Sequence, residues 1–352
     1  MAFLHGRPGP HWTHGAFARH IGAEFRYVDE SARWHDISLF APIRYIRWLH
    51  NAVTFPYHEY EVILTEGPHV WPPFGGRYLG KKPVFCLLGN QTAYFLYSGF
   101  FSSLTQKGLL AAFRRYHALI VIGQMQVRLL QELLGDEMPP YFVGKYGLPS
   151  ERLRSLERVR PTHETPRILL IAHGEEGWRT WYKGLDVFCE TIERVRRVRP
   201  EVEGVVIGSW TQREQARLLS LYPDCGVRFV GPTQDLESWI HTSTLYLHLA
   251  RGDAWPVSIL EAMAGGLPVI ASEWTGTAEV VHQVWPEGVS PLSSEEAAAR
   301  VLWYLDLPIS DRTAIGEKGR RWVNAHYRLD QALSHFETLF SAALEQVGLS
   351  VP

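Results

Sequence analysis

Cysteine is scarce in this sequence. Only Cys86, Cys189 and Cys225 occur among the 352 residues, and they lie far apart. This spacing excludes a disulfide framework and a cysteine-based zinc site. Sparing use of cysteine is typical of proteins in the reducing cytoplasm. No apolar run reaches the ~18 residues of a membrane-spanning helix, and the first ten residues combine charge with proline instead of forming a signal peptide. We therefore expect a cytoplasmic protein.

A large net charge is also lacking. The 35 Lys and Arg residues nearly balance the 37 Asp and Glu residues, which leaves a net charge of -2. A dedicated nucleic-acid-binding protein would be strongly basic, so we expect no nucleic-acid partner. Basic residues do outnumber acidic ones between residues 1 and 150. This local excess favours an anionic partner or surface for the first half of the chain.

Several common motifs are missing as well. The sequence contains no Gly-x-Gly-x-x-Gly, which argues against a dinucleotide-dependent oxidoreductase. It contains neither Asp-x-Asp nor His-Glu-x-x-His, so no pattern calls for a metal. Residues 75–82 resemble a phosphate-binding P-loop, but Lys82 stands where that loop needs Ser or Thr, and prolines precede it instead of a strand. We reject this segment as a P-loop and expect neither a metal nor a bound cofactor.

What is present suffices for two domains. The chain is 46% hydrophobic and longer than one average domain. Short apolar runs alternate with helical patterns in both halves, as in parallel βαβ units. In the first half we expect strands at 1–4, 25–28, 62–65, 84–88, 119–122 and 141–143, and helices at 13–21 and 127–134. In the second half we expect strands at 167–172, 204–207, 227–230, 245–249 and 268–271, and helices at 185–198, 213–221, 236–241 and 257–264.

The predicted fold is therefore α/β, with two Rossmann-like, doubly wound parallel-sheet domains. We place the first domain at residues 1–150, a linker at 151–166 and the second domain at 167–328. Residues 329–352 form a C-terminal helix that is expected to cross back to the first domain. Doubly wound sheets bind ligands beyond the carboxyl ends of their strands, so the sequence predicts a ligand in a central cleft between the domains.

The most informative segment, residues 251–272, reads RGDAWPVSILEAMAGGLPVIAS. An apolar strand delivers Asp253 into a loop, Pro256 suits the first turn of a helix, and Glu261 lies inside that helix. Carboxylates are good acceptors for vicinal hydroxyls. The exposed amides of the helix start, near Val257, favour phosphate. The segment thus predicts a site for a ligand that carries both groups; the alternative is an ordinary helix cap followed by a surface acid.

This segment resembles the signature of the retaining GT-B glycosyltransferases of the large glycogen-synthase-like class, which includes family 4. That signature is an acid, seven residues, a Glu and then Ala-Met-Ala-x-Gly-x-Pro-Val. Here the second acid is Glu261, and residues 261–271 match closely. The first acid, usually Glu, is Asp253; Ala254 replaces the usual Gly, and the aromatic residue before the proline is Trp255.

Weaker matches to the same class follow the first strand of the second half. Lys183 and Gly184 match the family's Lys-Gly pair, whose lysine holds the donor diphosphate. Arg179 stands as the companion arginine, at the end of a loop that is longer than the family's. The alternative for each of these cations is a solvated surface position.

Two glycine-containing elements complete the resemblance, which is specific across roughly residues 165–285. Gly208 ends a strand that matches a Gly-ended strand of the family. Gly276, Thr277 and Glu279 resemble the Gly-Gly-x-x-Glu element that follows the last strong strand. The alternative for Glu279 is a helix cap.

The first half resembles the family mainly in architecture. Family members often carry a His near the reacting carbon, after the strand that matches residues 84–88. Here that position holds Asn90, which is expected to supply a polar contact, although a plain loop residue is the alternative. The loop 6–11, with Gly9, stands where the family has a glycine-rich turn near the phosphates. No carboxylate of this half stands out as a nucleophile.

The resemblance implies a hexosyltransferase-like enzyme that moves a sugar from a nucleotide-diphosphate sugar to an acceptor hydroxyl, with retention and without a metal. In this interpretation Glu261 holds the ribose and Asp253 orients the sugar, while the second domain binds the donor and the first faces a carbohydrate or lipid-linked acceptor. Lys183, Arg179 and the helix start at Trp255–Val257 would stabilise the leaving diphosphate. A catalytically inactive GT-B-like scaffold protein and a GT-B nucleotide-sugar epimerase remain alternatives, and the oligomeric state stays open.

Residues 93–116 combine aromatic and basic side chains without an acid. Such a composition suits the head-group region of a membrane that carries anionic lipid. The segment predicts peripheral contact with the inner face of the membrane; the alternative is that its aromatic residues fill the core of the first domain. The residues concerned are Tyr94, Phe95, Tyr97, Phe100, Phe101, Lys107, Arg114 and Arg115.

Overall fold

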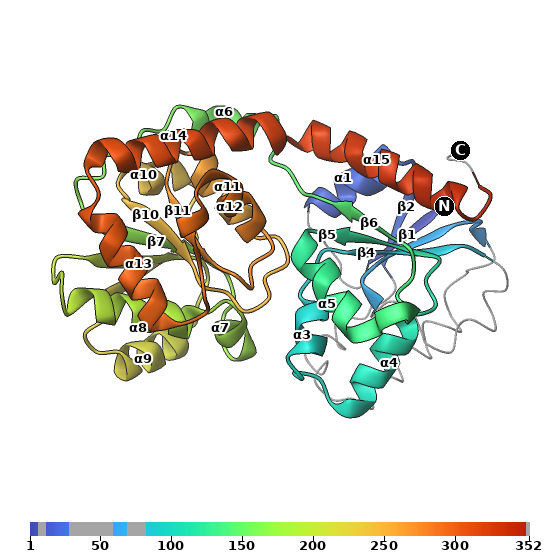
Figure 1. The fold of residues 1–352 in the computed structure, drawn as a ribbon, viewed down its shortest axis with the longest axis horizontal. Coiled ribbons are helices and arrows are strands. Elements are labelled where there is room, and N and C mark those ends of the chain that lie inside the picture. The colour runs from blue at the N-terminus through green and yellow to red at the C-terminus, as the bar shows by residue number, and fades with distance from the viewer. Residues whose placement is uncertain (6–11, 28–58, 69–81, 350–352) are drawn as a thin grey trace. The chain divides into compact units, whose positions relative to one another are not determined.

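The computed structural model describes residues 1–5, 12–27, 59–68 and 82–349. The chain divides into two compact units (Figure 1). The first comprises Met1–Tyr146 and Ala332–Pro352, and the second comprises Gly147–Gln331. The C-terminal segment therefore groups with the start of the chain.

The first unit is built on a six-stranded parallel sheet with the order β2-β1-β3-β4-β5-β6. The strands are β1 (Ala2–His5), β2 (Glu24–Tyr27), β3 (Ile63–Glu66), β4 (Val84–Leu88), β5 (Ala118–Ile122) and β6 (Tyr141–Gly144). The helices are α1 (Trp12–His20), α3 (Thr92–Tyr97), α4 (Ser103–Phe113), α5 (Gln124–Leu134), the short η5 (Gly135–Glu137) and α15 (Leu329–Glu345). Every residue of β4 and β5 is buried, which explains why these two strands have uninterrupted apolar sequences.

The C-terminal helix α15 supplies part of the core of the first unit. Phe336 stacks on Phe17 of α1, with ring centroids 4.2 Å apart and an angle of 6° between the planes. Phe340 meets Phe85 of β4 edge to face, at 5.6 Å. Buried aromatic pairs contribute apolar area and specific ring contacts, so α15 is integral to this unit.

The second unit has a parallel sheet with the order β12-β11-β10-β7-β8-β9. Its strands are β7 (Arg167–Ile171), β8 (Glu203–Ile207), β9 (Val227–Gly231), β10 (Leu245–His248), β11 (Val269–Ser272) and β12 (Val289–Ser290). The helices are α6 (Ser150–Glu157), α7 (Trp178–Tyr182), α8 (Leu185–Arg196), α9 (Gln212–Leu221), α10 (Leu236–His241), α11 (Val257–Ala264), α12 (Ala278–Val284), η6 (Pro286–Gly288), α13 (Ser294–Asp306) and α14 (Ile309–His326).

The strand order of each sheet reverses once, and this reversal decides where a ligand can bind. In the second unit the chain builds β7, β8 and β9 outward in one direction, then returns to add β10, β11 and β12 on the other side of β7. Helices α8 and α13 pack together on one face of the sheet, and α11 packs with α14 on the other (Figure 1). The loops after β7 and β10 consequently diverge to opposite faces and leave room at the carboxyl ends of these strands.

The two doubly wound sheets predicted from the sequence are confirmed, and each predicted strand lies within a residue or two of its expected position. The stretch 151–166 differs from the prediction. Instead of a linker alone, it contains most of α6, which packs on α11 and belongs to the second unit. Helix α6 is short and rich in charge, and the side chains of Leu153 and Leu156 are the two that it buries. Two apolar residues are too few to produce a recognisable helical pattern of hydrophobicity, so α6 was not predicted from the sequence.

Candidate functional site

The loop between β10 and α11 carries Asp253, and the segment after β11 fixes its path. The N–H of Gly276 donates to the carbonyl of Asp253 at 2.8 Å, and the Ser272 hydroxyl donates to the carbonyl of Ala250 at 2.6 Å. A Cβ on Gly276 would lie 1.6 Å from the carbonyl oxygen of Ala254, so only glycine fits there. This close approach explains the glycine that the sequence placed in the Gly-Gly-x-x-Glu element.

The segment that carries Lys183 is fixed against the same loop. Gly184 has a φ of +64°, and a Cβ there would lie 1.7 Å from the carbonyl oxygen of Leu249 at the end of β10. Glycine is therefore required by both conformation and space. Arg251 adds a bidentate ion pair with Asp186 of α8, with N–O distances of 2.8 and 2.9 Å. The loops that follow β7 and β10 are thus joined at the point where the strand order reverses.

These two loops bring Lys183 onto Asp253. The ammonium donates to Oδ2 of Asp253 at 2.6 Å, the Tyr182 hydroxyl donates to Oδ1 at 3.1 Å, and Nε2 of His248 lies 3.3 Å from Oδ2. Asp253 is only 6% exposed. Burial by itself raises the pKa of this carboxyl, but the charge of Lys183 and the hydrogen bond from His248 outweigh it and hold the pKa below its ordinary value. Asp253 is therefore an anion with three protein donors.

A second layer of polar groups supports this carboxylate. The Tyr246 hydroxyl lies 3.2 Å from Nδ1 of His248 and 2.8 Å from the hydroxyl of Ser258 on α11. Burial lowers the pKa of His248. A neutral imidazole with its proton on Nε2 donates to Asp253, so the ring holds the carboxylate without adding a second cation.

Glu261 lies in different surroundings, although it follows Asp253 by only eight residues. Its side chain is 20% exposed, and Oε1 accepts a hydrogen bond at 2.8 Å from Nε of Arg152 on α6. The same guanidinium reaches Glu237 of α10 at 2.9 Å. Among the described residues, no hydrogen bond or ion pair joins Glu261 to the Lys183–Asp253 pair. Arg152 could not be found from the sequence, because it falls in the stretch predicted to be a linker.

The starts of α11 and α12 each contribute one buried polar atom that lacks a partner. Trp255 is 5% exposed and its ring lies 6.0 Å from that of Tyr327, while Pro256 precedes the first helical residue, Val257. Within the described part of the chain, neither the indole N–H of Trp255 nor the hydroxyl of Thr277 has a hydrogen-bond partner. Such a group costs roughly 1–3 kcal/mol when it is buried. A ligand with acceptor oxygens at these two helix starts would remove that cost.

The remaining predicted residues of this unit lie around the same strand ends. Arg179 lies one helical turn before Lys183 on α7, with its guanidinium 5.0 Å from the ring centre of Trp178. A Cβ on Gly208 would lie 1.9 Å from the carbonyl of Ala172, which explains the glycine at the end of β8. Glu279 lies in the first turn of α12. The structure therefore joins Lys183 with Asp253 directly and leaves Arg179, Glu261 and Glu279 in separate contacts.

In the first unit Asn90 also lies at the carboxyl end of its sheet, directly after β4. Its Nδ2 donates to Glu66 at 2.8 Å, and its Oδ1 accepts from the N–H of Thr92 at 3.0 Å. Glu66 ends the neighbouring strand β3, and its side chain is 13% exposed. Glu66 was not among the site residues predicted from the sequence. The signal was its place directly after an apolar strand. Gly9 lies outside the described residues.

Two histidines extend this cluster in the first unit. His5, at the end of β1, lies 4.0 Å from Glu66 and 3.3 Å from His14 of α1. Nε2 of His14 lies 2.7 Å from the Tyr146 hydroxyl. A Cβ on Gly89 would lie 1.7 Å from that hydroxyl, so position 89 must be glycine for the Tyr146 side chain to fit beside it. Burial raises the pKa of Tyr146, and the charge of Glu66 adds to the effect.

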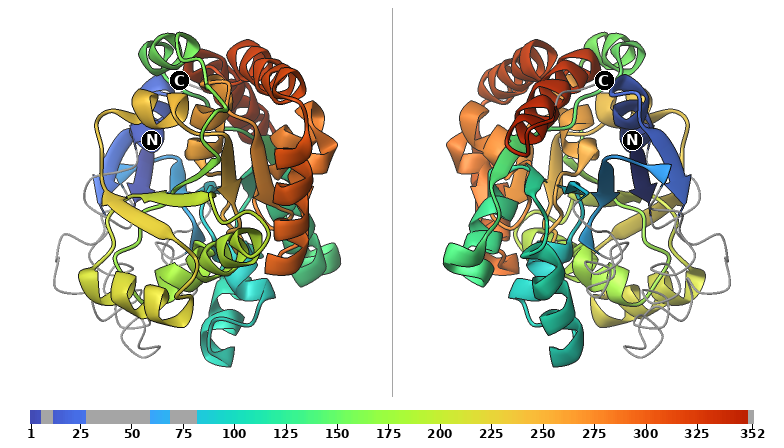
Figure 2. Two further views of the ribbon diagram at one scale, coloured as in Figure 1. Left: turned by 90° about the vertical axis from the view of Figure 1, so that its left-hand side faces the viewer. Right: turned by 90° about the vertical axis from the view of Figure 1, so that its right-hand side faces the viewer.

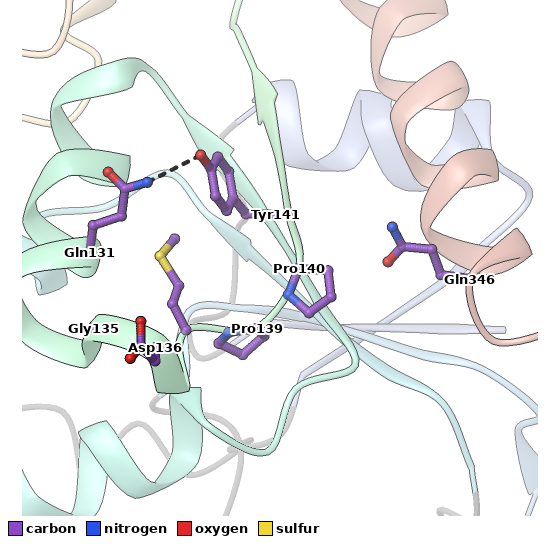
Figure 3. Close-up of a pocket in the computed structure, with 8 residues that line it drawn as sticks. Gln131, Gly135, Asp136, Pro139, Pro140, Tyr141 and Gln346 are labelled. Carbon is purple, nitrogen blue, oxygen red and sulfur yellow. Dashed lines mark hydrogen bonds between the residues drawn. The ribbon is translucent and has the colours of Figure 1, made fainter.

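A pocket of about 530 Å³ lies elsewhere in the first unit, near the start of β6 (Figure 3). Tyr141, the first residue of β6, lies on its wall, where Gln131 donates a hydrogen bond to the tyrosine hydroxyl at 3.2 Å. Parallel strands start at the edge opposite to their carboxyl ends, so this pocket is remote from the residues described above. The described ranges contain no group of three or more His, Cys, Asp or Glu side chains that could hold a metal ion.

Comparisons with known proteins match the second unit. Residues 167–306 match the sequence model of the family described as "Glycosyl transferases group 1". A phosphatidyl-myo-inositol mannosyltransferase of Propionibacterium freudenreichii is 37% identical over 26% of this chain and 22% of its own length. The lipopolysaccharide core biosynthesis mannosyltransferase LpcC of Rhizobium leguminosarum is 26% identical over 46% of this chain and 48% of its own length. The chain thus spans less than half the length of these two curated relatives.

The whole chain resembles solved structures in fold. Anabaena Alr3699/HepE in complex with UDP and glucose superposes with a TM-score of 0.68, at 16% identity, over 97% of this chain and all of that one. At this identity the likeness shows the fold alone. Together with the two parallel sheets, it shows that the chain has the GT-B fold, as the sequence predicted.

Proposed function

We propose that this protein is a glycosyltransferase that transfers a sugar from a nucleotide-diphosphate-sugar donor to an acceptor hydroxyl. The observation that carries the proposal is the Lys183–Asp253 pair at the reversal of strand order in the second sheet. This pair lies within the residues that match the group 1 glycosyl transferases. Both named curated relatives are mannosyltransferases, which supports a hexosyl donor.

Lys183 would bind the donor diphosphate. Its side chain is 19% exposed, and Asp253 holds its ammonium in place. Negative charge grows on the leaving diphosphate as the bond between the anomeric carbon and the phosphate oxygen breaks. Lys183, Arg179 and the amides at the start of α11 would stabilise that charge without a metal. The unpartnered N–H of Trp255 and hydroxyl of Thr277 add two groups that phosphate oxygens can satisfy.

Glu261 would hold the ribose, because it offers a partly exposed carboxylate about one helical turn beyond the start of α11. Asp253 would act chiefly by holding Lys183 in place. The two carboxylate oxygens of Asp253 already accept hydrogen bonds from Lys183, Tyr182 and His248. Its side chain is also one methylene shorter than that of the usual Glu. A sugar hydroxyl could bind Asp253 only by replacing one of these three donors.

Retention of configuration would follow from attack on the same face as the departing phosphate. In that route the acceptor oxygen bonds to the anomeric carbon while the bond to the leaving phosphate breaks, and the acceptor proton passes to the leaving phosphate oxygen. No protein nucleophile is required. The resemblance of residues 251–272 to the retaining class supports this part of the proposal.

The acceptor would be a carbohydrate or lipid-linked glycan that lies against the first unit. The names of both relatives point to membrane lipids, namely a phosphatidyl-inositol and a lipopolysaccharide core. Glu66 and Asn90 at the carboxyl end of the first sheet offer groups that bind hydroxyls. No described helix is long and apolar enough to cross a membrane.

The test is a panel of nucleotide-diphosphate sugars, first by thermal shift and then by donor consumption with and without acceptors such as octyl glycosides. Stabilisation by a donor and consumption that depends on an acceptor are expected. The anomeric coupling constant of the product, measured by NMR, reports retention. Conversion of the donor without an acceptor would indicate an epimerase instead. Donor binding without any turnover would indicate a binding protein.

A further inference from the structure

One arginine joins two carboxylates from two other helices near the proposed nucleotide site. Arg152 of α6 donates from Nε to Oε1 of Glu261 at 2.8 Å and from Nη1 to Oε1 of Glu237 at 2.9 Å. The contacts span 109 and 85 positions of sequence. The three side chains are 20–30% exposed, so the cluster is partly accessible to solvent.

The position of Arg152 is fixed by the packing of α6. Arg320 of α14 donates to the carbonyls of Glu157 and Val159 at the end of α6, the latter at 2.6 Å, and to that of Gly265 after α11 at 3.0 Å. One buried guanidinium therefore ties the ends of α6 and α11 together. Because both helices are tied, the distance between Arg152 and Glu261 is set by backbone rather than by flexible side chains alone.

We propose that Arg152 is a positioning residue that orients the Glu261 carboxylate toward the ribose hydroxyls of the donor; this inference rests on the proposed function. The planar guanidinium forms a directional, charge-assisted bond with Oε1. Within the described residues, Oε2 of Glu261 accepts no hydrogen bond, so it remains for the ligand.

The charge of the cluster selects the kind of group that binds. Glu237 accepts a hydrogen bond from Nη1 of Arg152, so one guanidinium is shared between two carboxylates. The three side chains together carry a net charge of −1. A net negative cluster attracts neutral hydroxyl donors and disfavours phosphate. Lys183, which is held by Asp253 instead, remains the phosphate ligand. The arrangement assigns the diol end and the phosphate end of the nucleotide to different residues.

The test measures dissociation constants of UDP, GDP and ADP and of their 2′,3′-dideoxy counterparts by calorimetry, with the full-length chain. The wild-type protein should bind its preferred ribonucleotide about tenfold more tightly than the dideoxy form. In Arg152→Gln that preference should fall to nearly one, as it should in Glu261→Gln, while the affinity for the dideoxy form stays unchanged. Arg152→Lys should restore part of the preference. Arg154→Gln, on the exposed side of α6, is the matched control and should behave as wild type.

Each other outcome overturns the inference. If Arg152→Gln keeps the ribose preference, Arg152 does not act on the ribose. If it binds ribonucleotides more tightly, the arginine competes with the ligand instead of positioning its partner. Equal loss for ribo and dideoxy forms indicates a structural role, which thermal unfolding of the variants would also reveal. Failure of the wild-type protein to bind any nucleoside diphosphate overturns the proposed function itself, and the inference with it.

Discussion

The ammonium of Lys183 donates a 2.6 Å hydrogen bond to Oδ2 of Asp253, although 70 positions of sequence separate the two residues. The cation that we assign to the donor diphosphate is thus already held by an acid. Tyr182 and His248 hold the same acid from other directions. A ligand phosphate would meet a lysine whose position is set before binding, which lowers the cost of ordering it.

Replacement of Lys183 should lower both activity and stability, and a second replacement at Asp253 should separate the two effects. Lys183→Ala should lower kcat by ~10²-fold, because one donor to the leaving group is lost. It should also lower the free energy of unfolding by roughly 3 kcal/mol, since the Asp253 carboxylate stays buried without its cation. The double variant Lys183→Met, Asp253→Asn should regain stability but not activity. Lys318→Ala, on the exposed face of α14, is the control. Full activity in Lys183→Ala would contradict the assignment.

Gly184→Ala should damage the loop that carries Lys183. A methyl group there meets the Leu249 carbonyl at 1.7 Å, whereas Gly177, with a φ of +71°, has no atom within 4 Å of such a group. Gly177→Ala should therefore lower the free energy of unfolding by only about 1 kcal/mol, which is the cost of placing alanine in the left-handed conformation. Gly184→Ala should cost clearly more in denaturant unfolding and should weaken nucleotide binding. Equal costs would show that the loop moves freely away from β10.

His248 should make stability depend on pH. Burial lowers the pKa of His248 below the ordinary value of about 6.5, although its bond to Asp253 opposes the shift. The unfolded chain therefore takes up the proton first as pH falls. The neutral His248 therefore adds to the free energy of unfolding above about pH 6.5, and this contribution is lost as the pH falls through the pKa of the folded state.

Thermal unfolding at pH 7.5 and 5.5 checks this expectation. The midpoint of the wild-type protein should fall on acidification, and His248→Gln should remove part of that fall. His282→Gln, at an exposed position on α12, should leave it unchanged. A wild-type midpoint that is the same at both pH values would argue against a neutral, buried imidazole beside Asp253.

Activity should survive an excess of EDTA. We expect Lys183, Arg179 and the amides at the start of α11 to stabilise the negative charge of the leaving diphosphate, so that magnesium is not required for transfer. Donor consumption with and without EDTA is the measurement, with a magnesium-dependent kinase as the positive control for chelation. Complete loss of turnover that magnesium restores would show that a metal takes part.

Helices α3 and α4 should attach the protein to anionic membranes. Figure 2 shows α4, in cyan, projecting from the sheet of the first unit. Of the predicted aromatic residues, Tyr94 and Phe95 are buried, but Tyr97 at the end of α3 is 43% exposed. Leu104 of α4 is 58% exposed. The exposed cation Lys107 follows on the same helix as Leu104.

Sedimentation with liposomes of phosphatidylglycerol at low and high salt tests this expectation. Binding should weaken with salt, because cations near the surface contribute about 1 kcal/mol each. Tyr97→Ser and Lys107→Ala should each reduce binding. Trp303→Ser, at an exposed aromatic position on α13 of the other unit, should not. Equal binding to neutral phosphatidylcholine would contradict the electrostatic part.

The sequence predicted the sheets well because buried parallel strands leave uninterrupted apolar runs, such as those of β4 and β5. It also identified Lys183, Asp253 and Glu261 as site candidates through the family resemblance. It could not predict that Lys183 binds Asp253 or that Arg152 binds Glu261. These contacts depend on tertiary packing over 70 and 109 positions, for which a single sequence carries no local signal.

Helix α15 has a consequence for how the protein is made. Most of the first unit precedes the second in sequence, yet the hydrogen bond between His335 and the Val143 carbonyl spans 192 positions, and Phe336 and Phe340 come from a helix that follows the second unit. During translation the second unit can form its core before Phe336 is available to stack on Phe17. A fragment that ends at Tyr146 would lack that aromatic layer, so separate expression of the first unit requires residues 332–352 to be joined to it.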